Sequence, residues 1–129
     1  MTIKEMLETY RTIAVVGLSS RPYRASHGVS RYMQRAGYRI IPVNPLETEV
    51  LGEKSYASLD DVPESFEIVD IFRRAQFVPD IVEAAIRRKA KVIWMQQGVV
   101  HEAAAERARA AGLEVVMDLC ILQEHMALF

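Results

Sequence analysis

The chain has 129 residues, half of them hydrophobic and 26% charged, and its formal net charge at pH 7 is -1. This composition is that of a globular protein and excludes a disordered one. No apolar run approaches the ~20 residues that a membrane helix needs, which excludes a membrane protein. The length favours one domain over residues 1–129. A net charge near zero gives no positive field for nucleic acid, so we expect neither a nucleic-acid nor a membrane partner.

The first predicted elements are a short helix and a strand. Thr2 is followed three residues later by Glu5, which is the spacing of a capping box and predicts a helix over residues 2–10. The apolar run at residues 12–16 predicts the first strand, and Gly17 ends it.

A polar loop then leads into a second helix and a second strand. The helix is predicted to begin near Ser26 and to stop at Gly37. Residues 38–43 predict the second strand. Because Pro42 has no N–H to donate to a neighbouring strand, we expect this strand to lie at a sheet edge or to end early.

The second half of the chain alternates between strands and helices. Residues 46–67 are less regular, with one helical turn near residues 59–63. Further strands are predicted at residues 68–72, 91–95 and 113–117, and helices are predicted from near Pro79, at 101–111 and at 120–129. Strands alternating with helices of about 10 to 12 residues indicate a parallel sheet. We therefore expect an α/β, Rossmann-like fold: an open parallel sheet of about five strands with helices on both faces.

The loop after the first strand has the composition of a phosphate-binding loop. A glycine turn lets a ligand approach the backbone, and the following helix start offers unpaired N–H groups and a positive dipole. Ser19 and Pro22 stand where a dinucleotide fingerprint would have glycines, and no Walker-type lysine follows, which argues against NTP hydrolysis. Gly17 alone can equally serve a tight turn. The serines and arginines around it favour a phosphate ligand.

Polar residues also follow the next two strands, where ligands of open parallel sheets bind. An NAD-binding domain usually has an acidic residue after the second strand, but here Asn44-Pro45 stands there. Asn44 can donate to a phosphate or a base, and it can equally cap the following turn. Arg73 and Arg74 follow the third strand, where two arginines can clamp a phosphate or simply form surface. Arg21 and Arg24 are loop candidates for the same role.

No catalytic or metal-binding group can be assembled from the sequence. His27 begins a helix, and His101 and His125 lie in helical segments without ligand spacing to other donors, so we expect no metal site. Cys120 is the single cysteine, so no internal disulfide can form, and this fits a cytoplasmic protein. We expect Cys120 to be a small buried residue rather than a nucleophile. Trp94 is expected in the core.

Five motifs in this order resemble the small stand-alone CoA-binding domain proteins: AVVGLSSRPYRASHG, PVNP, VDIFRR, VIWMQQGV and GLEVVMDLC. The resemblance covers about residues 13–120. This family is similar to the CoA-binding domain of the succinyl-CoA synthetase alpha subunit, in which the glycine loop cradles the CoA phosphates. A further domain of that subunit carries the phosphorylated histidine, and the resemblance does not extend to it, so ligase chemistry is not implied.

The resemblance implies coenzyme A, or an acyl-CoA, as the ligand and assigns parts of it to residues. Gly17, Ser19 and Ser20 would contact the pyrophosphate, residues 43–45 would border the adenosine, and Gln96 would lie along the pantetheine arm. Phe72 and Arg73 would line the wall of the next crevice. The complete candidate set is Gly17, Leu18, Ser19, Ser20, Arg24, Ser26, Val43, Asn44, Pro45, Phe72, Arg73, Arg74 and Gln96.

The sequence leaves three functions open. The first is a CoA- or acyl-CoA-binding protein with no catalytic residues of its own. The second is a small NAD(P)- or CoA-thioester-linked enzyme, which lacks both a ribose-binding acid after the second strand and an acid–base pair. The third is a regulatory module that senses a nucleotide and acts on a protein partner.

Overall fold

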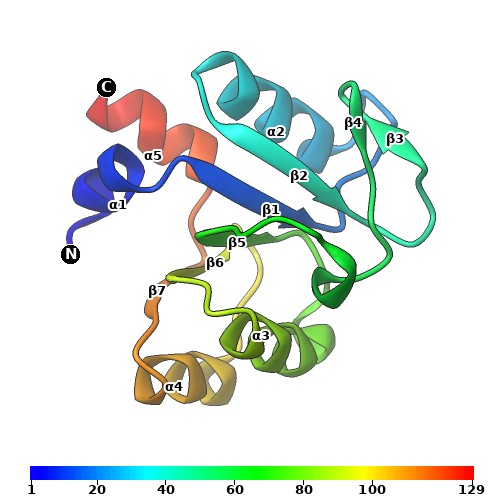
Figure 1. Cartoon of the computed structure of the whole chain (residues 1–129). Helices are drawn as coiled ribbons and strands as arrows, with labels where there is room; N and C mark the ends of the chain where they lie inside the picture. The colour runs from blue at the N-terminus through cyan, green and yellow to red at the C-terminus, as the bar shows by residue number, and fades with distance from the viewer.

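In the computed structural model, which describes residues 1–129, five parallel strands form one open sheet (Figure 1). Across the sheet they run β2 (Arg39–Val43), β1 (Thr12–Val16), β5 (Ile68–Ile71), β6 (Val92–Met95) and β7 (Glu114–Met117). The chain passes from β1 to β2 on one side and later continues with β5 on the other side of β1. The order of the strands therefore reverses between β1 and β5, which is the place where open α/β sheets bind ligands.

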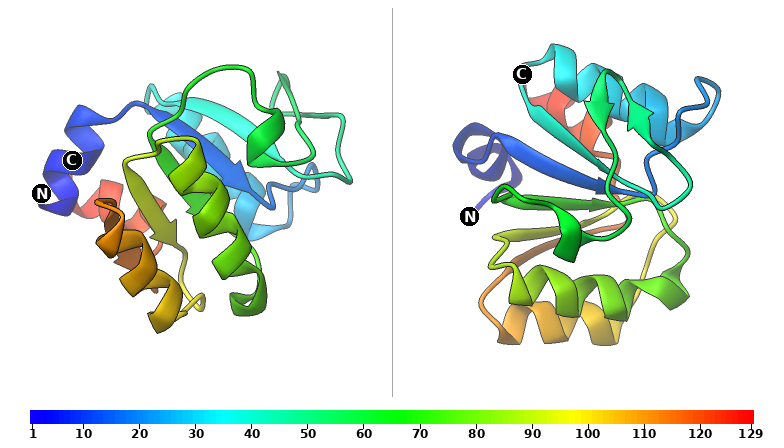
Figure 2. Two further views of the ribbon diagram at one scale, coloured as in Figure 1. Left: turned by 60° about the horizontal axis from the view of Figure 1, so that its bottom comes forward. Right: turned by 45° about the vertical axis from the view of Figure 1, so that its right-hand side comes forward.

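Helices cover both faces of the sheet, which confirms the Rossmann-like α/β fold (Figures 1 and 2). One face carries α1 (Ile3–Thr9), α2 (Ala25–Arg35) and α5 (Ile121–Leu128), and the other carries α3 (Val78–Arg87) and α4 (Glu102–Ala110). None of these helices combines the length and the apolar character needed to cross a membrane.

The side chains of each strand point alternately into two hydrophobic cores. On β5, Val69 and Ile71 belong to the core that includes Val78 and Val82 of α3. Ile68 belongs to the other core, together with Trp94, and both side chains are fully buried. Burying a large apolar side chain contributes about 1.5–3 kcal/mol, so the two cores hold the strands and helices in place. Trp94 lies in the core as expected, and its Nε1–H donates to the carbonyl of Leu119 at 2.8 Å.

The predictions for the first helix and the second strand are confirmed. The hydroxyl of Thr2 accepts a hydrogen bond from the N–H of Glu5, and the Glu5 carboxylate accepts one from the N–H of Thr2, which is a complete capping box. β2 is the edge strand of the sheet, and β1 is the only strand that pairs with it, with Pro42 opposite Val15. The N–H of Tyr56 donates to the carbonyl of Pro42 at 3.1 Å, so a loop segment covers this edge.

The segment between β2 and β5 contains more regular structure than the sequence predicts. A small antiparallel hairpin pairs β3 (Glu49–Val50) with β4 (Glu53–Lys54), and its turn places Leu51 at φ 55 and Gly52 at φ 77. The expected helical turn is the short helix η1 (Leu59–Asp61), and a second turn, η2 (Ala75–Phe77), precedes α3.

Candidate functional site

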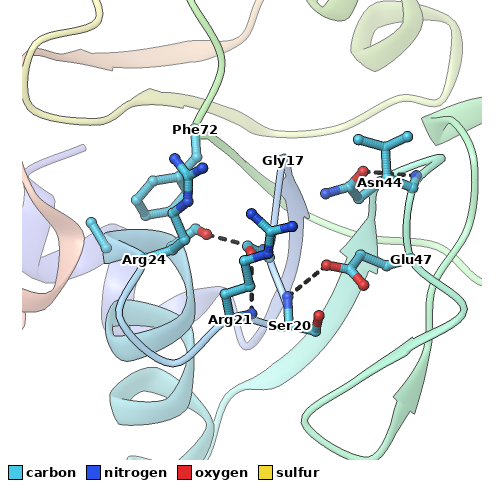
Figure 3. A pocket seen from close by; sticks show the side chains of 11 residues that line it. Gly17, Ser20, Arg21, Arg24, Asn44, Glu47 and Phe72 are labelled. Carbon is cyan, nitrogen blue, oxygen red and sulfur yellow. Dashed lines mark hydrogen bonds between the residues drawn. The ribbon is translucent and has the colours of Figure 1, made fainter.

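A cleft of about 500 Å3 opens at the carboxyl end of β1 (Figure 3). We call it the loop cleft, because its walls are the loop after β1, the start of α2, the loop after β2 and the residue that follows β5. Its lining residues are Gly17, Ser19, Ser20, Arg21, Arg24, Ala25, Ser26, Asn44, Leu46, Glu47 and Phe72. The cleft therefore lies where the strand order reverses between β1 and β5.

Backbone hydrogen bonds join three strand ends at the floor of the loop cleft. The N–H of Gly17 donates to the carbonyl of Val43 at 2.8 Å, and the N–H of Phe72 donates to the carbonyl of Val16 at 2.9 Å. Gly17 has φ +91, and a Cβ atom at this position would lie 2.5 Å from the carbonyl oxygen of Phe72. The close approach of β1 and β5 therefore requires glycine at position 17, whatever the cleft binds.

The loop after Gly17 is held by two serine hydroxyls, one from the loop and one from the start of α2. The N–H of Ser19 donates to the hydroxyl of Ser26 at 3.0 Å, and the N–H of Arg21 donates to the hydroxyl of Ser19 at 3.1 Å. Ser26 is buried, so its hydroxyl shapes the loop. The N–H of Ser20 points out of the loop, toward Glu47 (Figure 3).

The N-terminus of α2 opens into the loop cleft without a cap. Arg24 is its N-cap residue, no side chain caps the helix, and its first turn contains no acidic residue. The unpaired N–H groups and the helix dipole therefore favour an anion here. Arg21 and Arg24 add two exposed positive charges, and the Arg24 guanidinium lies 5.9 Å from the ring centre of Tyr23.

Asn44 connects the loops after β1 and β2. Its Nδ2 donates to the carbonyl of Leu18 at 3.1 Å, and its Oδ1 accepts from the N–H of Leu46 at 3.0 Å. The second of these bonds caps the turn, which is one of the two roles that the sequence left open. An amide nitrogen has two hydrogens, so Nδ2 keeps one donor for a ligand.

Glu47 is a residue of the cleft that the sequence analysis missed. No acid directly follows β2, but three residues after Asn44 the carboxylate of Glu47 lies in the cleft and accepts a hydrogen bond from the N–H of Ser20 at 2.7 Å. This hydrogen bond, aided by the charge of Arg21, lowers the pKa of Glu47 below its ordinary value. The Asn-Pro turn was the sequence signal that could have placed Glu47 in the cleft, since this turn reverses the chain and returns the next residues toward the loop after β1.

A second cavity, which we call the Gln96 hollow, adjoins the loop cleft and has a volume of about 490 Å3. Ala25 and Phe72 line both of them. The remaining lining residues are Val29, Arg73, Arg74, Gln96, Gln97, Gly98, Val99 and Cys120. Gln96 is buried, and its Oε1 accepts a hydrogen bond from the N–H of Ile121 at 3.0 Å. Cys120 is only partly buried and lines this hollow, which corrects the expectation of a buried position.

A third cavity of about 310 Å3, the Pro45 hollow, lies between the ends of β1 and β2 and helix α3. It contains the predicted site residues Val43, Pro45 and Arg73. Arg73 also lines the Gln96 hollow, and its guanidinium lies 4.1 Å from the ring centre of Phe77. The predicted residues are therefore distributed over three neighbouring cavities. Leu18 is the exception: its side chain is fully buried in the core, and only its carbonyl reaches Asn44.

Two histidines have structural partners outside the three cavities. The Nδ1 of His101 accepts a hydrogen bond from the N–H of Ala104 at 3.1 Å and caps α4. The Nδ1 of His125 lies 2.8 Å from the hydroxyl of Tyr32, and burial, with the charge of Arg11, lowers the pKa of His125.

Asp70, on the central strand β5, is a buried carboxyl group. The residue is 1% exposed and pairs in register with Val15 and Trp94, which both belong to the core that includes Val29 and Met33 of α2. Its Oδ1 has no hydrogen-bond partner, and neither has the buried hydroxyl of Ser30 on α2. Burial without a partner disfavours the charged form and raises the pKa of Asp70 well above its ordinary value.

Comparison with known proteins relates nearly the whole chain to one family. The family model for the CoA binding domain matches residues 11–126. The uncharacterized protein YneT of Bacillus subtilis is 48% identical over 123 residues, which are 95% of this chain and 91% of YneT. A solved structure of a hypothetical protein from Pyrococcus horikoshii OT3 is similar with a TM-score of 0.95 at 40% identity, and the match covers 98% of this chain and 89% of that one.

A more distant relative is part of an enzyme. The alpha subunit of ADP-forming acetate–CoA ligase I from Pyrococcus furiosus is 30% identical over 95 residues. These residues are 69% of this chain but only 21% of the ligase subunit. The similarity to the enzyme is therefore confined to one part of it.

Proposed function

The chain belongs to the CoA-binding domain family, and we propose that it binds coenzyme A or an acyl-CoA and catalyses no reaction of its own. The observation that carries the proposal is the loop cleft, where the uncapped N-terminus of α2 and two arginines meet at the point of strand reversal. We assign the diphosphate of the ligand to this cleft, because helix N–H groups and guanidinium groups bind phosphate oxygens well.

The Pro45 hollow is the proposed site for the adenine base. Val43, Pro45 and Ile81 give it apolar walls that suit the faces of a purine. The carboxylates of Asp60 and Asp80 also line it and can accept hydrogen bonds from an amino group.

The Gln96 hollow is the proposed site for the pantetheine arm. Phe72 belongs to both this hollow and the loop cleft, so an arm attached to the diphosphate can continue along its ring. Val29 and Val99 offer apolar contacts, and the side chains of Gln96 and Gln97 are amides like those of the arm itself. A base, a diphosphate and an uncharged arm thus have three neighbouring cavities of matching character.

The proposal of a binding protein without catalysis is supported by the surroundings of the nucleophilic side chains. Acyl transfer requires a nucleophile next to a general base. His101 and His125 hydrogen-bond to structural partners outside the cavities. Cys120 lies in the Gln96 hollow, and none of the three histidines, His27 included, lines that hollow.

Calorimetric titration with CoA, acetyl-CoA, NAD and ADP-ribose tests the choice of ligand. We expect CoA or acetyl-CoA to bind most tightly, and tighter binding of NAD would contradict the proposal. Prolonged incubation with acetyl-CoA, followed by mass spectrometry, tests the absence of catalysis. We expect the thioester to remain intact beyond its spontaneous hydrolysis, and turnover would show that the protein is an enzyme.

A further inference from the structure

One carboxylate lies among the groups to which we assign the diphosphate. Glu47 lines the loop cleft and accepts the hydrogen bond of the Ser20 N–H at 2.7 Å. Because this bond and the nearby Arg21 lower its pKa, Glu47 is ionised at neutral pH. A negative charge at this point repels an incoming phosphate, and it also occupies a donor that a phosphate oxygen would use.

The Ser20 N–H is bonded to a carboxylate that comes from the loop after β2. The N–H groups on either side of it, those of Ser19 and Arg21, are bound by the hydroxyls of Ser26 and Ser19 at 3.0 and 3.1 Å. Those two bonds fix the loop against the start of α2 and leave the Ser20 N–H directed toward the cleft. Glu47 therefore takes the position of an external anion.

Asn44 holds Glu47 close to Ser20. The N–H of Leu46 donates to Asn44 Oδ1 at 3.0 Å, and the N–H of Glu47 donates to the Asn44 carbonyl at 3.2 Å. Asn44 is in turn bound to Leu18 of the opposite loop. A carboxylate on such a short tether competes as if it were present at a concentration on the order of millimolar or above.

We propose that Glu47 is an internal anion that occupies the Ser20 N–H in the free protein and is displaced when a phosphate group of the ligand binds. This inference rests on the proposed function, since it concerns the same cleft. Every ligand that displaces Glu47 loses the same amount of binding free energy. Small anions such as inorganic phosphate or diphosphate make few other contacts, so Glu47 keeps them out of the cleft. A nucleotide with a base and an arm gains further contacts in the Pro45 and Gln96 hollows, which offset the displacement of Glu47.

Calorimetric titration of the Glu47→Gln variant tests the proposal. Glutamine has the same size but no charge, so we expect both CoA and inorganic diphosphate to bind about tenfold more tightly than to the wild type. Glu49→Gln is the matched control, because it removes the same charge from an exposed residue of β3 that does not line the cleft. Its affinities should equal those of the wild type, and circular dichroism should show that both variants are folded.

The possible outcomes separate this inference from the proposed function. Unchanged or weaker binding of inorganic diphosphate and CoA by Glu47→Gln overturns the inference, even if the wild type binds CoA. If the wild type fails to bind CoA but Glu47→Gln gains affinity for inorganic diphosphate, the result supports the role of Glu47 as an internal anion and contradicts the proposed function.

Amide NMR gives a second measurement that does not depend on affinity. In the free wild-type protein, the Ser20 amide resonance should shift as Glu47 is protonated below neutral pH. At saturating CoA this shift should disappear, because the amide then bonds to the ligand. A Ser20 resonance that follows the titration of Glu47 equally with and without CoA would rule out displacement.

Discussion

The carbonyl oxygen of Phe72 leaves no room for a side chain on Gly17, where a Cβ atom would lie 2.5 Å from it. The oxygen belongs to the backbone and the Cβ would be bonded directly to the Gly17 Cα, so neither atom can move aside without separating the ends of β1 and β5. The same contact also sets the shape of the loop cleft, because Gly17 and Phe72 both line it.

Replacing Gly17 with alanine should therefore destabilise the protein more than its backbone angle alone explains. Gly112→Ala is the matched control, since Gly112 also has φ +91 but nothing lies within 4 Å of its added Cβ. We expect a loss of about 1 kcal/mol for Gly112→Ala and of about 3 kcal/mol or more for Gly17→Ala, measured by urea denaturation. Equal losses for the two variants would show that the approach of Phe72 is unimportant.

Arg24→Ala should weaken the binding of CoA about tenfold, because a charge-assisted hydrogen bond to phosphate is lost. The affinity of the wild type should also fall as salt concentration rises, and the variant should show a smaller dependence on salt. Arg31→Ala removes a charge from the exposed side of the same helix and serves as the control. If Arg24→Ala binds CoA as tightly as the wild type does, Arg24 does not belong to the proposed site.

Asn44→Ala should reduce both stability and affinity, because it deletes the bonds to Leu18 and Leu46 that connect two loops. At about 0.5–1.5 kcal/mol for each hydrogen bond, the loss of stability should be about 1–3 kcal/mol in thermal or urea denaturation. Ser58→Ala, which breaks an exposed hydrogen bond to Asp61, should cost less. An Asn44 variant with unchanged stability but weaker ligand binding would instead indicate that the residue acts only through the ligand.

The stability of the protein should depend on pH through Asp70, whose pKa is raised by burial in the folded state. Below the unfolded pKa the carboxyl is protonated in both states. As the pH rises, the unfolded state loses the proton first, so the folded state is destabilised progressively until the pH passes the folded pKa, by about 1.4 kcal/mol for each unit between the two values.

Asp70→Asn should abolish this loss, so the variant should gain stability relative to the wild type as the pH rises above about 4. Urea denaturation at a series of pH values measures the difference in the free energy of unfolding between the variant and the wild type. Burying the amide adds the same cost at every pH, so it does not affect how this difference changes with pH. Glu106→Gln, at an exposed position of α4, controls for the loss of a carboxylate. A difference between Asp70→Asn and the wild type that stays constant with pH would mean that folding does not raise the pKa of Asp70.

The main elements of the fold could be predicted because their signals are local. Each strand of the main sheet is a short apolar run, and the run at residues 12–16 ends at a glycine that the tertiary structure requires, so the predicted strand agrees with β1. The edge position of β2 followed from the missing N–H of Pro42. The hairpin of β3 and β4 was missed because strands of two residues show no periodicity.

The candidate site was predictable only in part, because its shape depends on contacts between distant segments. The sequence identified Asn44 but could not choose between a turn and a ligand, and the structure shows the bond that caps the turn. Glu47 was missed since its bond to Ser20 spans 27 residues and exists only when two loops meet. For Cys120, composition suggested burial, whereas the start of α5 places it at the wall of a cavity.

The hydrogen bonds that join the ends of β1, β2 and β5 give the loop cleft a floor and a rim of different character. The amides of Gly17 and Phe72 are bonded to neighbouring strands, so their hydrogens exchange with solvent only when the centre of the sheet opens. At the rim, Leu46 is 89% exposed and Tyr23 is 77% exposed, and the Ser20 amide is held only by a side chain. A bound ligand should therefore slow hydrogen exchange at the rim and leave exchange at the floor unchanged, because the floor is already formed in the free protein.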